Sequence, residues 1–205
     1  MYFPYGGTET DYLRERDPRL GAVIDRLGHI DRELDPDLFT AVVSSIVAQQ
    51  ISNAVLATVW GRVNDLLGGE VNPERVLAAG TDAIQACGMT FRKAGYITDF
   101  ASRVADGSFD LEAVSHMTDA EAVAALSSLR GVGTWTAEMI LLFSLARPDI
   151  LAFDDLGIQR GMCLVYHHRK ITRDIFARHR RRLSPYGSIA SLYFWEVAAN
   201  GMPGE

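Results

Sequence analysis

The chain has 205 residues, of which 48% are apolar and 22% are charged, and its formal net charge is −6 at pH 7. These values predict one large or two small globular domains, and the negative charge argues mildly against a nucleic-acid partner. No run of about 18 uncharged apolar residues is present, so no membrane span is predicted. The first residues are polar and acidic, unlike a secretory signal. We therefore expect a cytoplasmic protein.

Helix start and stop signals recur along the chain, and no strand-like alternation of any length is present. Asp35-Pro36 predicts a helix over LFTAVVSSIVAQQ, and Ser52 predicts one that ends at Gly68-Gly69. The further predicted starts are Asn72-Pro73, Thr81, Thr90, Thr118 with Glu121 as a capping box, Thr134, Asp154 or Asp155, Thr172 and Ser184-Pro185. The helix that starts at Thr81 is predicted to follow a break near Gly80. The sequence thus predicts an all-α protein of roughly ten short helices.

Cysteines and histidines give no sign of a metal site. Cys87 and Cys163 lie far apart and form no C-x-x-C pair. This suits a reducing compartment and excludes a disulfide framework and a four-cysteine metal site. His167 and His168 are adjacent, so on a helix they would point about 100° apart and make a poor metal pair. We interpret both as part of a solvated helix end.

Positive charge is concentrated in one part of this acidic chain. From His167 to Leu183 there are seven lysines and arginines against a single acid, Asp174. A polarised molecule of this kind could present a basic face to phosphate groups. A solvated helix face accounts for the same run equally well, so both interpretations stay open.

The segment LRGVGTWTA, residues 129–137, predicts a helix, a tight glycine turn and a second helix. Gly131 and Gly133 can adopt positive φ and leave backbone N–H groups uncovered. The helix that begins directly afterwards adds its own unpaired N–H groups and the positive end of its dipole. Together these features predict a site for one anionic group, although a G-x-G turn alone is a weak signal.

This segment resembles the helix-hairpin-helix (HhH-GPD) of the base-excision DNA glycosylase superfamily, whose members carry L-P-G-[VI]-G-x-x-T-A. Three further stretches resemble the DNA-3-methyladenine glycosylase II branch of that superfamily: FTAVVSSIVAQQIS, GMTFRKAGYITDFA and SIASLYFW. The four matches span residues 39 to 195 in the family's order. The resemblance implies an all-α, two-lobed glycosylase fold. Because only about 38 residues precede the first match, it implies no N-terminal β domain.

The resemblance also implies an activity and a domain organisation. Residues 38–145 would form one helical lobe with the hairpin, residues 1–37 and 146–205 the second, and the active-site cleft would lie between them. The protein would be a monomeric hydrolase of base excision repair that flips alkylated purines, of the 3-methyladenine and 7-methylguanine type, out of double-stranded DNA. Two alternatives remain: a same-fold glycosylase for deaminated or oxidised bases, and a non-catalytic helix-hairpin-helix DNA-binding protein.

Asp155, in AFDDLGIQRG, matches the position of the superfamily's essential aspartate. Cleavage of an N-glycosidic bond passes through a sugar with oxocarbenium character. A carboxylate near C1′ stabilises that charge and orients or deprotonates the attacking water. Both Asp154 and Asp155 could instead cap the next helix. With the resemblance, we expect catalysis from Asp155 and capping from Asp154.

Trp135 stands where strand-nicking members of the superfamily carry the lysine of L-P-G-V-G-x-K-T-A, which attacks C1′. An indole cannot form that Schiff base, so the resemblance implies an enzyme without AP lyase activity. Trp135, Met139 and Trp195 are expected to line the base pocket, although each tryptophan could equally be a core residue. Trp60 lies outside any motif and is predicted to be core.

The remaining predicted contacts are with the DNA itself. Gln50, with Ile51 beside it, is the predicted wedge that fills the gap left by the flipped nucleotide, although an amide at a helix end could instead bind a carbonyl. The hairpin contacts are assigned to Arg130, Gly131, Val132, Gly133, Thr134 and Thr136. The family allows a structural Na⁺ or K⁺ ion at the carbonyls near Gly131 and Gly133, and no organic cofactor or catalytic metal is expected.

The sequence departs from the family at three places in these segments. Arg130 replaces the usual proline before the hairpin, and Met139 stands where some members have an aromatic residue. Tyr186-Gly187 lies where many members have an arginine. These departures leave the base preference and one backbone contact open.

Overall fold

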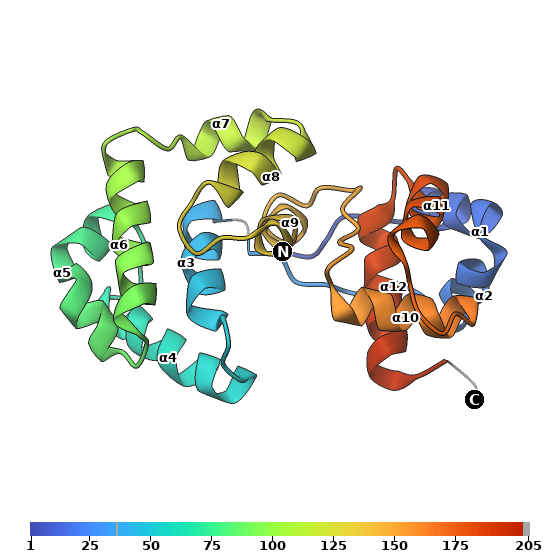
Figure 1. Cartoon of the computed structure of the whole chain (residues 1–205), viewed down its shortest axis with the longest axis horizontal. Helices are drawn as coiled ribbons and strands as arrows, with labels where there is room; N and C mark the ends of the chain where they lie inside the picture. Colours follow the sequence, from blue (N-terminus) through green and yellow to red (C-terminus); the bar gives the residue numbers. More distant parts are fainter. Residues whose placement is uncertain (36, 203–205) are drawn as a thin grey trace. The chain divides into compact units, whose positions relative to one another are not determined.

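The computed structural model describes residues 1–35 and 37–202, and Figure 1 labels its helices in chain order. The described residues form twelve α-helices and no β-strand, and one isolated antiparallel bridge pairs Tyr2 with Glu33. The prediction of an all-α fold is therefore confirmed. Within the described part of the chain, no helix has both the length and the apolar character to cross a membrane.

The chain divides into two compact units. Unit 1 comprises residues 1–34 and 141–205, and unit 2 comprises residues 35–140. Unit 1 contains α1 (Gly7–Arg16), α2 (Pro18–Leu27), α10 (Leu156–Tyr166), α11 (Arg173–Leu183) and α12 (Gly187–Asn200). Unit 2 contains α3 (Leu38–Ala48), α4 (Asn53–Leu66), α5 (Pro73–Ala86), α6 (Phe91–Ala105), α7 (Leu111–His116) and α8 (Asp119–Ser127). The boundary falls within α9 (Thr134–Phe143).

The core of unit 2 is built around α3, whose sequence is almost entirely apolar. Val42, Val43 and Ile46 have no exposed surface. Phe39 stacks on Phe100 of α6 with ring centroids 4.9 Å apart, and α5 and α6 lie side by side (Figure 1). Full burial of such a side chain stabilises a protein by about 1.5–3 kcal/mol. The end of α3, where the predicted wedge lies, is therefore attached to a rigid core.

In unit 1, α10 and α12 cross closely (Figure 1). The crossing depends on Gly161, because a Cβ at this position would overlap the backbone of Phe194. Phe194 and its neighbour Tyr193 are fully buried. This contact fixes the start of α10, where Asp155 lies, relative to Trp195 on α12.

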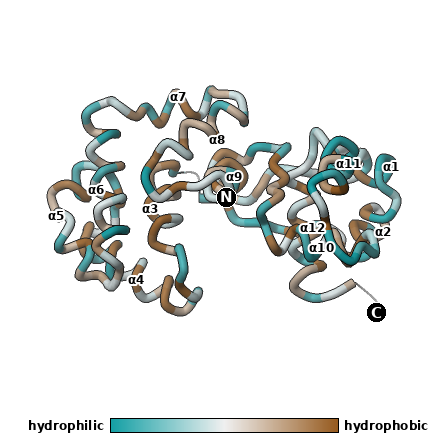
Figure 2. Tube along the Cα trace, in the orientation of Figure 1, coloured by the Kyte–Doolittle hydropathy of each residue, from teal (hydrophilic) through white to brown (hydrophobic). Residues whose placement is uncertain are grey.

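Several predicted helix starts are confirmed, since the named side chain accepts a backbone hydrogen bond from its own helix. These are Ser52, Asn72, Thr90, Thr118 and Thr172. The predicted break near Gly80 is present as a kink inside α5, where Gly80 has φ 77°. Figure 2 shows α11 as mostly hydrophilic, and its buried residues are Phe176 and Leu183.

Other helix boundaries were predicted wrongly. Asp37, not Asp35, caps α3, and Pro36 lies outside the described residues. Thr134 is the first residue of α9 rather than its cap. The predicted start at Ser184-Pro185 is also wrong, because α12 begins at Gly187. Asp35 and Asp37 are both capping residues, so the sequence could not decide between them, whereas the N-cap of α12 is Tyr186, whose side chain makes no capping bond.

Three helices were not predicted as separate elements, and one ends early. The helices α1 and α7 carry few apolar residues at helical spacing, so their pattern is weak. The helix α2 has a clear apolar face, with Leu20, Val23, Ile24 and Leu27 at helical spacing, and sequence reasoning missed it. The helix after Thr118 was predicted to reach Arg130 but ends at Ser127. The residues after it turn into the hairpin.

Candidate functional site

The hairpin joins α8 to α9 in unit 2. Gly131 has φ +87°, and a Cβ at this position would overlap the ring of Tyr96 from α6. Only glycine fits both constraints. Gly133 does not have a positive φ, and a Cβ there would meet no atom within 4 Å. The expectation of positive φ thus holds for Gly131 alone, whereas the missing side chain of Gly133 leaves an exposed stretch of backbone open.

The beginning of α9 can receive an anion. Gly133, Thr134 and Trp135 are exposed there, and the first N–H groups of a helix lack intrahelical acceptors and lie at the positive end of its dipole. Arg130 is exposed beside them, with its guanidinium 5.7 Å from the centroid of the Tyr96 ring. The predicted contact residues Val132 and Thr136 have buried side chains.

The carbonyl groups of the hairpin leave limited room for the Na⁺ or K⁺ ion that the family allows. Gly131 O accepts a hydrogen bond from Gln49 Nε2 at 2.6 Å, and Gly133 O accepts one from Ala137 N at 2.9 Å. A carbonyl oxygen has two lone pairs, so one acceptor position remains on each. A monovalent ion with Gly131 O and Gly133 O as its ligands remains a prediction.

The turn after α3 carries the predicted wedge. Gln50 is exposed and has φ 57°, a left-handed conformation that residues with side chains rarely adopt. Ile51 beside it is half-buried. The amide–carbonyl contact that the sequence left as an alternative is made by Gln49, not Gln50. Gln50 is therefore exposed in a strained turn, and its role as the wedge remains a prediction.

A cavity of about 250 Å³ adjoins this turn in unit 2. It is lined by Ser45, Ala48, Gln49, Gln50, Trp135, Thr136 and Met139. Four of the predicted site residues, Gln50, Trp135, Thr136 and Met139, are thus brought together. Trp135 is 45% exposed, so it is not a core residue. Trp60 on α4 is half-buried and does not line this cavity.

Asp155 is the N-cap of α10 in unit 1. Its Oδ1 atom accepts hydrogen bonds from the backbone N–H of Ile158 at 2.7 Å and from Nε1 of Trp195 at 2.9 Å. The residue is only 7% exposed, yet its neighbour Leu156 is 81% exposed, so the carboxylate lies just beneath the surface. Two donors on one oxygen hold the carboxylate in a single orientation.

The expected division of roles between the two aspartates is wrong in one respect. Asp155 itself caps α10, whereas Asp154 is exposed and lies 3.8 Å from the guanidinium of Arg173. The reason is register, since α10 begins one residue later than a cap at Asp154 would require. Asp155 therefore combines the cap with a hydrogen bond from Trp195.

Trp195 belongs to an aromatic cluster that also holds a positive charge. Its indole stacks on Phe143 with centroids 5.6 Å apart, and the guanidinium of Arg32 lies 5.6 Å and 5.8 Å from the Phe143 and Trp195 rings. Arg32 Nε is buried without a hydrogen-bond partner. Sequence reasoning missed Arg32 and Phe143, because neither belongs to a motif and no spacing connects them with Trp195.

The basic run of residues 167–183 separates into internal and exposed charges. Arg180 binds Asp149 and Arg182 binds Asp17 within unit 1. The charges that stay exposed are Arg169, Lys170, Arg173, Arg178 and Arg181. Tyr186, at the position where many family members have an arginine, packs its ring edge-to-face on Tyr12.

His167 is exposed at the end of α10, but the interpretation of His168 as solvated is wrong. His168 is half-buried, with Nε2 3.4 Å from Nε2 of His179. His179 stacks on Tyr166 and lies beside Arg182, and burial followed by the Arg182 charge lowers its pKa to about 4. Among the described residues no three His, Cys, Asp or Glu side chains form a metal-binding group. Tyr166, His168, His179 and Arg182 line a cavity of about 340 Å³ within unit 1, together with Asp17, Pro18 and Arg19.

From residue 43 to residue 185, the sequence matches the family described as HhH-GPD superfamily base excision DNA repair protein. The match includes the hairpin, the wedge turn and Asp155. The chain belongs to this superfamily.

Relatives with this HhH-GPD fold carry a consistent name. A putative DNA-3-methyladenine glycosylase of Bacillus subtilis is 26% identical over 184 residues, which cover 86% of this chain and 64% of that protein. DNA-3-methyladenine glycosylase 1 of Schizosaccharomyces pombe is 24% identical, covering 78% of this chain and 72% of that protein. The chain thus spans about two thirds of the length of these relatives. The resemblance to the DNA-3-methyladenine glycosylase branch is confirmed.

Solved structures agree with the fold. A DNA-3-methyladenine glycosidase from Bacillus halodurans superposes with a TM-score of 0.89 at 31% identity, covering 98% of this chain and 93% of that one. The S. pombe 3-methyladenine DNA glycosylase, solved in complex with abasic DNA, gives a TM-score of 0.82 at 21% identity, covering 97% of this chain and 100% of that one. At that identity the second likeness supports the fold alone.

Proposed function

We propose that this HhH-GPD protein is a monofunctional DNA glycosylase that excises alkylated purines, of the 3-methyladenine and 7-methylguanine type, from double-stranded DNA. The observation that carries the proposal is the buried carboxylate of Asp155, held by Ile158 and Trp195. A non-catalytic DNA-binding module does not need a carboxylate oriented in this way. The names of the relatives support the same activity.

The proposed reaction needs one carboxylate and one water molecule. The bond between C1′ and the purine nitrogen breaks, and its electron pair leaves with the cationic base, which departs neutral. The sugar gains oxocarbenium character, which the negative charge of Asp155 stabilises. Water then attacks C1′ and gives a proton to Asp155 or to solvent, leaving an abasic site. This chemistry requires no organic cofactor.

Each predicted contact residue has its own part in the proposed reaction. The backbone at Gly133 would hold a phosphate, Gln50 would enter the base stack, and Asp155 would face C1′ of the flipped nucleotide. Trp135 and Met139 offer an aromatic and a polarizable wall, which suits a cationic purine through cation–π attraction. We propose that the protein acts in this way as a monomer.

The absence of AP lyase activity is part of the proposal. Trp135 occupies the position of the Schiff-base lysine and carries no amine. Lys93 is tied to backbone carbonyls of α3 and is not available as a nucleophile. The product should therefore be an intact strand with an abasic site, which alkali cleaves.

Arg32 favours a second candidate, excision of neutral deaminated purines. Its fixed positive charge lies beside Trp195 and repels a cationic base, whereas a carbonyl oxygen at purine C6 would accept a hydrogen bond from a guanidinium. Hypoxanthine is neutral and has such a carbonyl. The unpartnered Nε atom of Arg32 is consistent with a polar group in this region.

A panel of lesion-bearing duplexes tests both candidates. We expect release of 3-methyladenine and 7-methylguanine, with strand cleavage only after alkali. Release of hypoxanthine alone would replace the first candidate with the second. Tight binding without release of any base would support a DNA-binding module instead, and nicking without alkali would contradict the assignment of a monofunctional enzyme.

A further inference from the structure

The end of α3 is held by a lysine from another helix. Lys93, in the first turn of α6, donates from Nζ to the carbonyl of Val47 at 2.9 Å and to that of Gln49 at 2.5 Å. The last carbonyls of a helix have no intrahelical partner and carry partial negative charge, so a cation stabilises them. Lys93 thus binds the backbone on both sides of Ala48, immediately before Gln50.

The same turn is also attached to the hairpin. The Gln49 side chain donates to the carbonyl of Gly131 at 2.6 Å. Tyr96, which lies one turn after Lys93 on α6, packs against Gly131 at the place where a side chain would otherwise be. One face of α6 therefore contacts both the wedge turn and the hairpin, and Gln49 connects these two directly.

We propose that Lys93 and Gln49 are positioning residues that fix the wedge turn, residues 49–52, relative to the phosphate-binding hairpin. This inference rests on the proposed function, because it gives Gln50 a task only if a base is flipped. Neither residue touches the reacting atoms. They keep Gln50 in its left-handed conformation and at a constant distance from the backbone of Gly133, which would bind the phosphate.

The physical reason is that a wedge offsets the cost of unstacking only if it arrives already ordered. A mobile turn would lose conformational entropy when it inserts, and this loss would reduce how much of the unstacking cost the insertion offsets. In a single strand there is no opposing stack to fill, so the wedge has little to do. Loss of the two positioning contacts should therefore reduce activity on duplex DNA far more than on single-stranded DNA.

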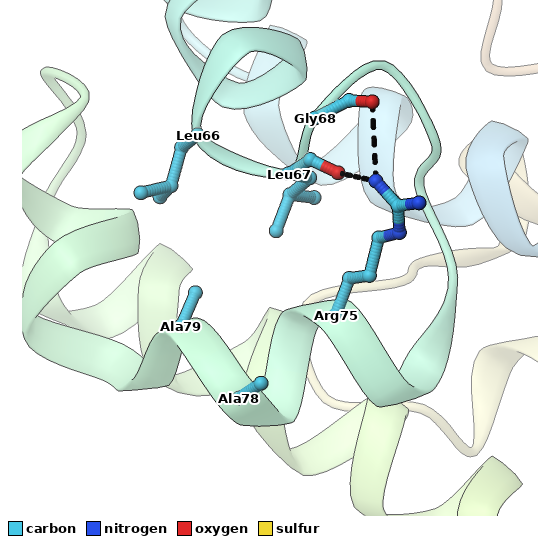
Figure 3. Close-up of a pocket in the computed structure, with 6 residues that line it drawn as sticks. All are labelled: Leu66, Leu67, Gly68, Arg75, Ala78 and Ala79. Atoms are coloured by element: carbon cyan, nitrogen blue, oxygen red, sulfur yellow. Dashed lines mark hydrogen bonds between the residues drawn. The ribbon is translucent and has the colours of Figure 1, made fainter.

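Arg75 provides a matched control in the same unit. It donates from its guanidinium to the carbonyls of Leu67 and Gly68 at 2.5 Å and 3.1 Å, and so holds the C-terminal end of α4 as Lys93 holds that of α3 (Figure 3). Arg75 also forms an ion pair with Glu70 at 2.6 Å, and no predicted site residue lies among the contacts that Arg75 makes with the described residues. The variant Arg75→Met removes a cation from a helix end without touching the wedge turn.

The experiment measures single-turnover base release by the full chain with Lys93→Met, Gln49→Met and Arg75→Met. Each variant receives the same lesion in a duplex and in a single strand. We expect Lys93→Met and Gln49→Met to lose at least about tenfold on the duplex and less than about threefold on the single strand. Arg75→Met should leave the ratio of the two rates unchanged, even if its melting temperature falls.

A second readout separates this inference from the proposed function. 2-Aminopurine beside an uncleavable abasic analogue in a duplex becomes fluorescent when a wedge disrupts its stack, with no need for base release. Wild type that disrupts the stack but releases no base would overturn the proposed function and leave the inference standing, provided that Lys93→Met and Gln49→Met lose the signal.

Two results would overturn the inference itself. One is equal loss on duplex and single strand in a variant that remains folded, and the other is an unchanged duplex rate together with an unchanged fluorescence signal. If Lys93→Met fails to fold, Gln49→Met decides, because it keeps both lysine contacts and removes only the bond to Gly131.

Discussion

The two units of this HhH-GPD protein supply different kinds of contact. In unit 2, the candidate DNA contacts depend on backbone conformation: an open helix start at Gly133 and a left-handed turn at Gln50. In unit 1, they depend on side chains: the carboxylate of Asp155, the indole of Trp195 that binds it, and the guanidinium of Arg32. Changes at the hairpin of unit 2 should therefore alter DNA binding, changes at its wedge turn should alter base release from duplex DNA, and changes at Asp155 or Trp195 in unit 1 should alter the chemical step.

The largest expected effect is that of Asp155→Asn on the rate of base release. Loss of the charge and of the proton acceptor should lower single-turnover base release by about 10²–10⁴-fold. Asparagine caps a helix as well as aspartate does, so the melting temperature should stay close to that of wild type. Asp154→Asn is the matched control and should keep the wild-type rate. Equal rates of base release for the two variants would show that Asp155 has no catalytic role.

Alanine at the two hairpin glycines should affect different properties: stability at Gly131 and DNA binding at Gly133. Gly131→Ala forces a side chain into a positive φ and against Tyr96, which should lower the free energy of unfolding by about 1–3 kcal/mol. Gly133→Ala meets no protein atom, so its unfolding should be unchanged while its Kd for duplex DNA rises about tenfold. Chemical denaturation and a DNA titration check both. An unchanged Kd for DNA in Gly133→Ala would contradict the assignment of a phosphate contact to Gly133.

Trp195→Phe tests whether the indole acts through Asp155. The variant removes the N–H donor and keeps an aromatic ring against Phe143. We expect kcat to fall about tenfold with little change in KM, since a hydrogen bond to a charged group contributes about 1.5–3 kcal/mol. A raised KM with an unchanged kcat would show instead that Trp195 stacks on the base.

The smallest effect is a pH dependence of stability confined to unit 1. Burial, with the charge of Arg182, lowers the pKa of His179 to about 4 from an ordinary value of 6.5. Between these values the unfolded chain binds a proton that the folded chain does not, so stability should fall as the pH drops from 6.5 towards 4. In His179→Gln this part of the decline should be absent. Chemical denaturation at several pH values in that range measures the free energy of unfolding of both proteins. An equal decline of this free energy with falling pH in wild type and His179→Gln would contradict the prediction.

The sequence identified what depends on local chemistry. Glycine spacing marked the hairpin, and polar residues before apolar runs marked most helix starts, because both reflect backbone requirements that act within a few residues. The choice between Asp154 and Asp155 as cap could not be made locally. It depends on where α10 begins, which is Leu156, and on the hydrogen bond that Asp155 accepts from Trp195 of α12.

The contacts that complete the candidate site join residues distant in the chain. Arg32 contacts Phe143 and Trp195, which lie more than a hundred residues away in the sequence, and hydrophobic periodicity cannot predict such a contact. Lys93 was visible in a family motif, yet its bonds to the end of α3 depend on how α6 packs against α3. Packing between helices, rather than local propensity, decides these contacts.

The most direct test of this division compares Asp155→Asn with Gly133→Ala in two measurements on the same methylated duplex: the Kd, and the rate of base release at saturating protein. The account predicts that Asp155→Asn binds like wild type and releases almost no base, whereas Gly133→Ala binds weakly and releases base at the wild-type rate once saturated. Wild-type release by Asp155→Asn, or a rate defect in saturated Gly133→Ala, would contradict it.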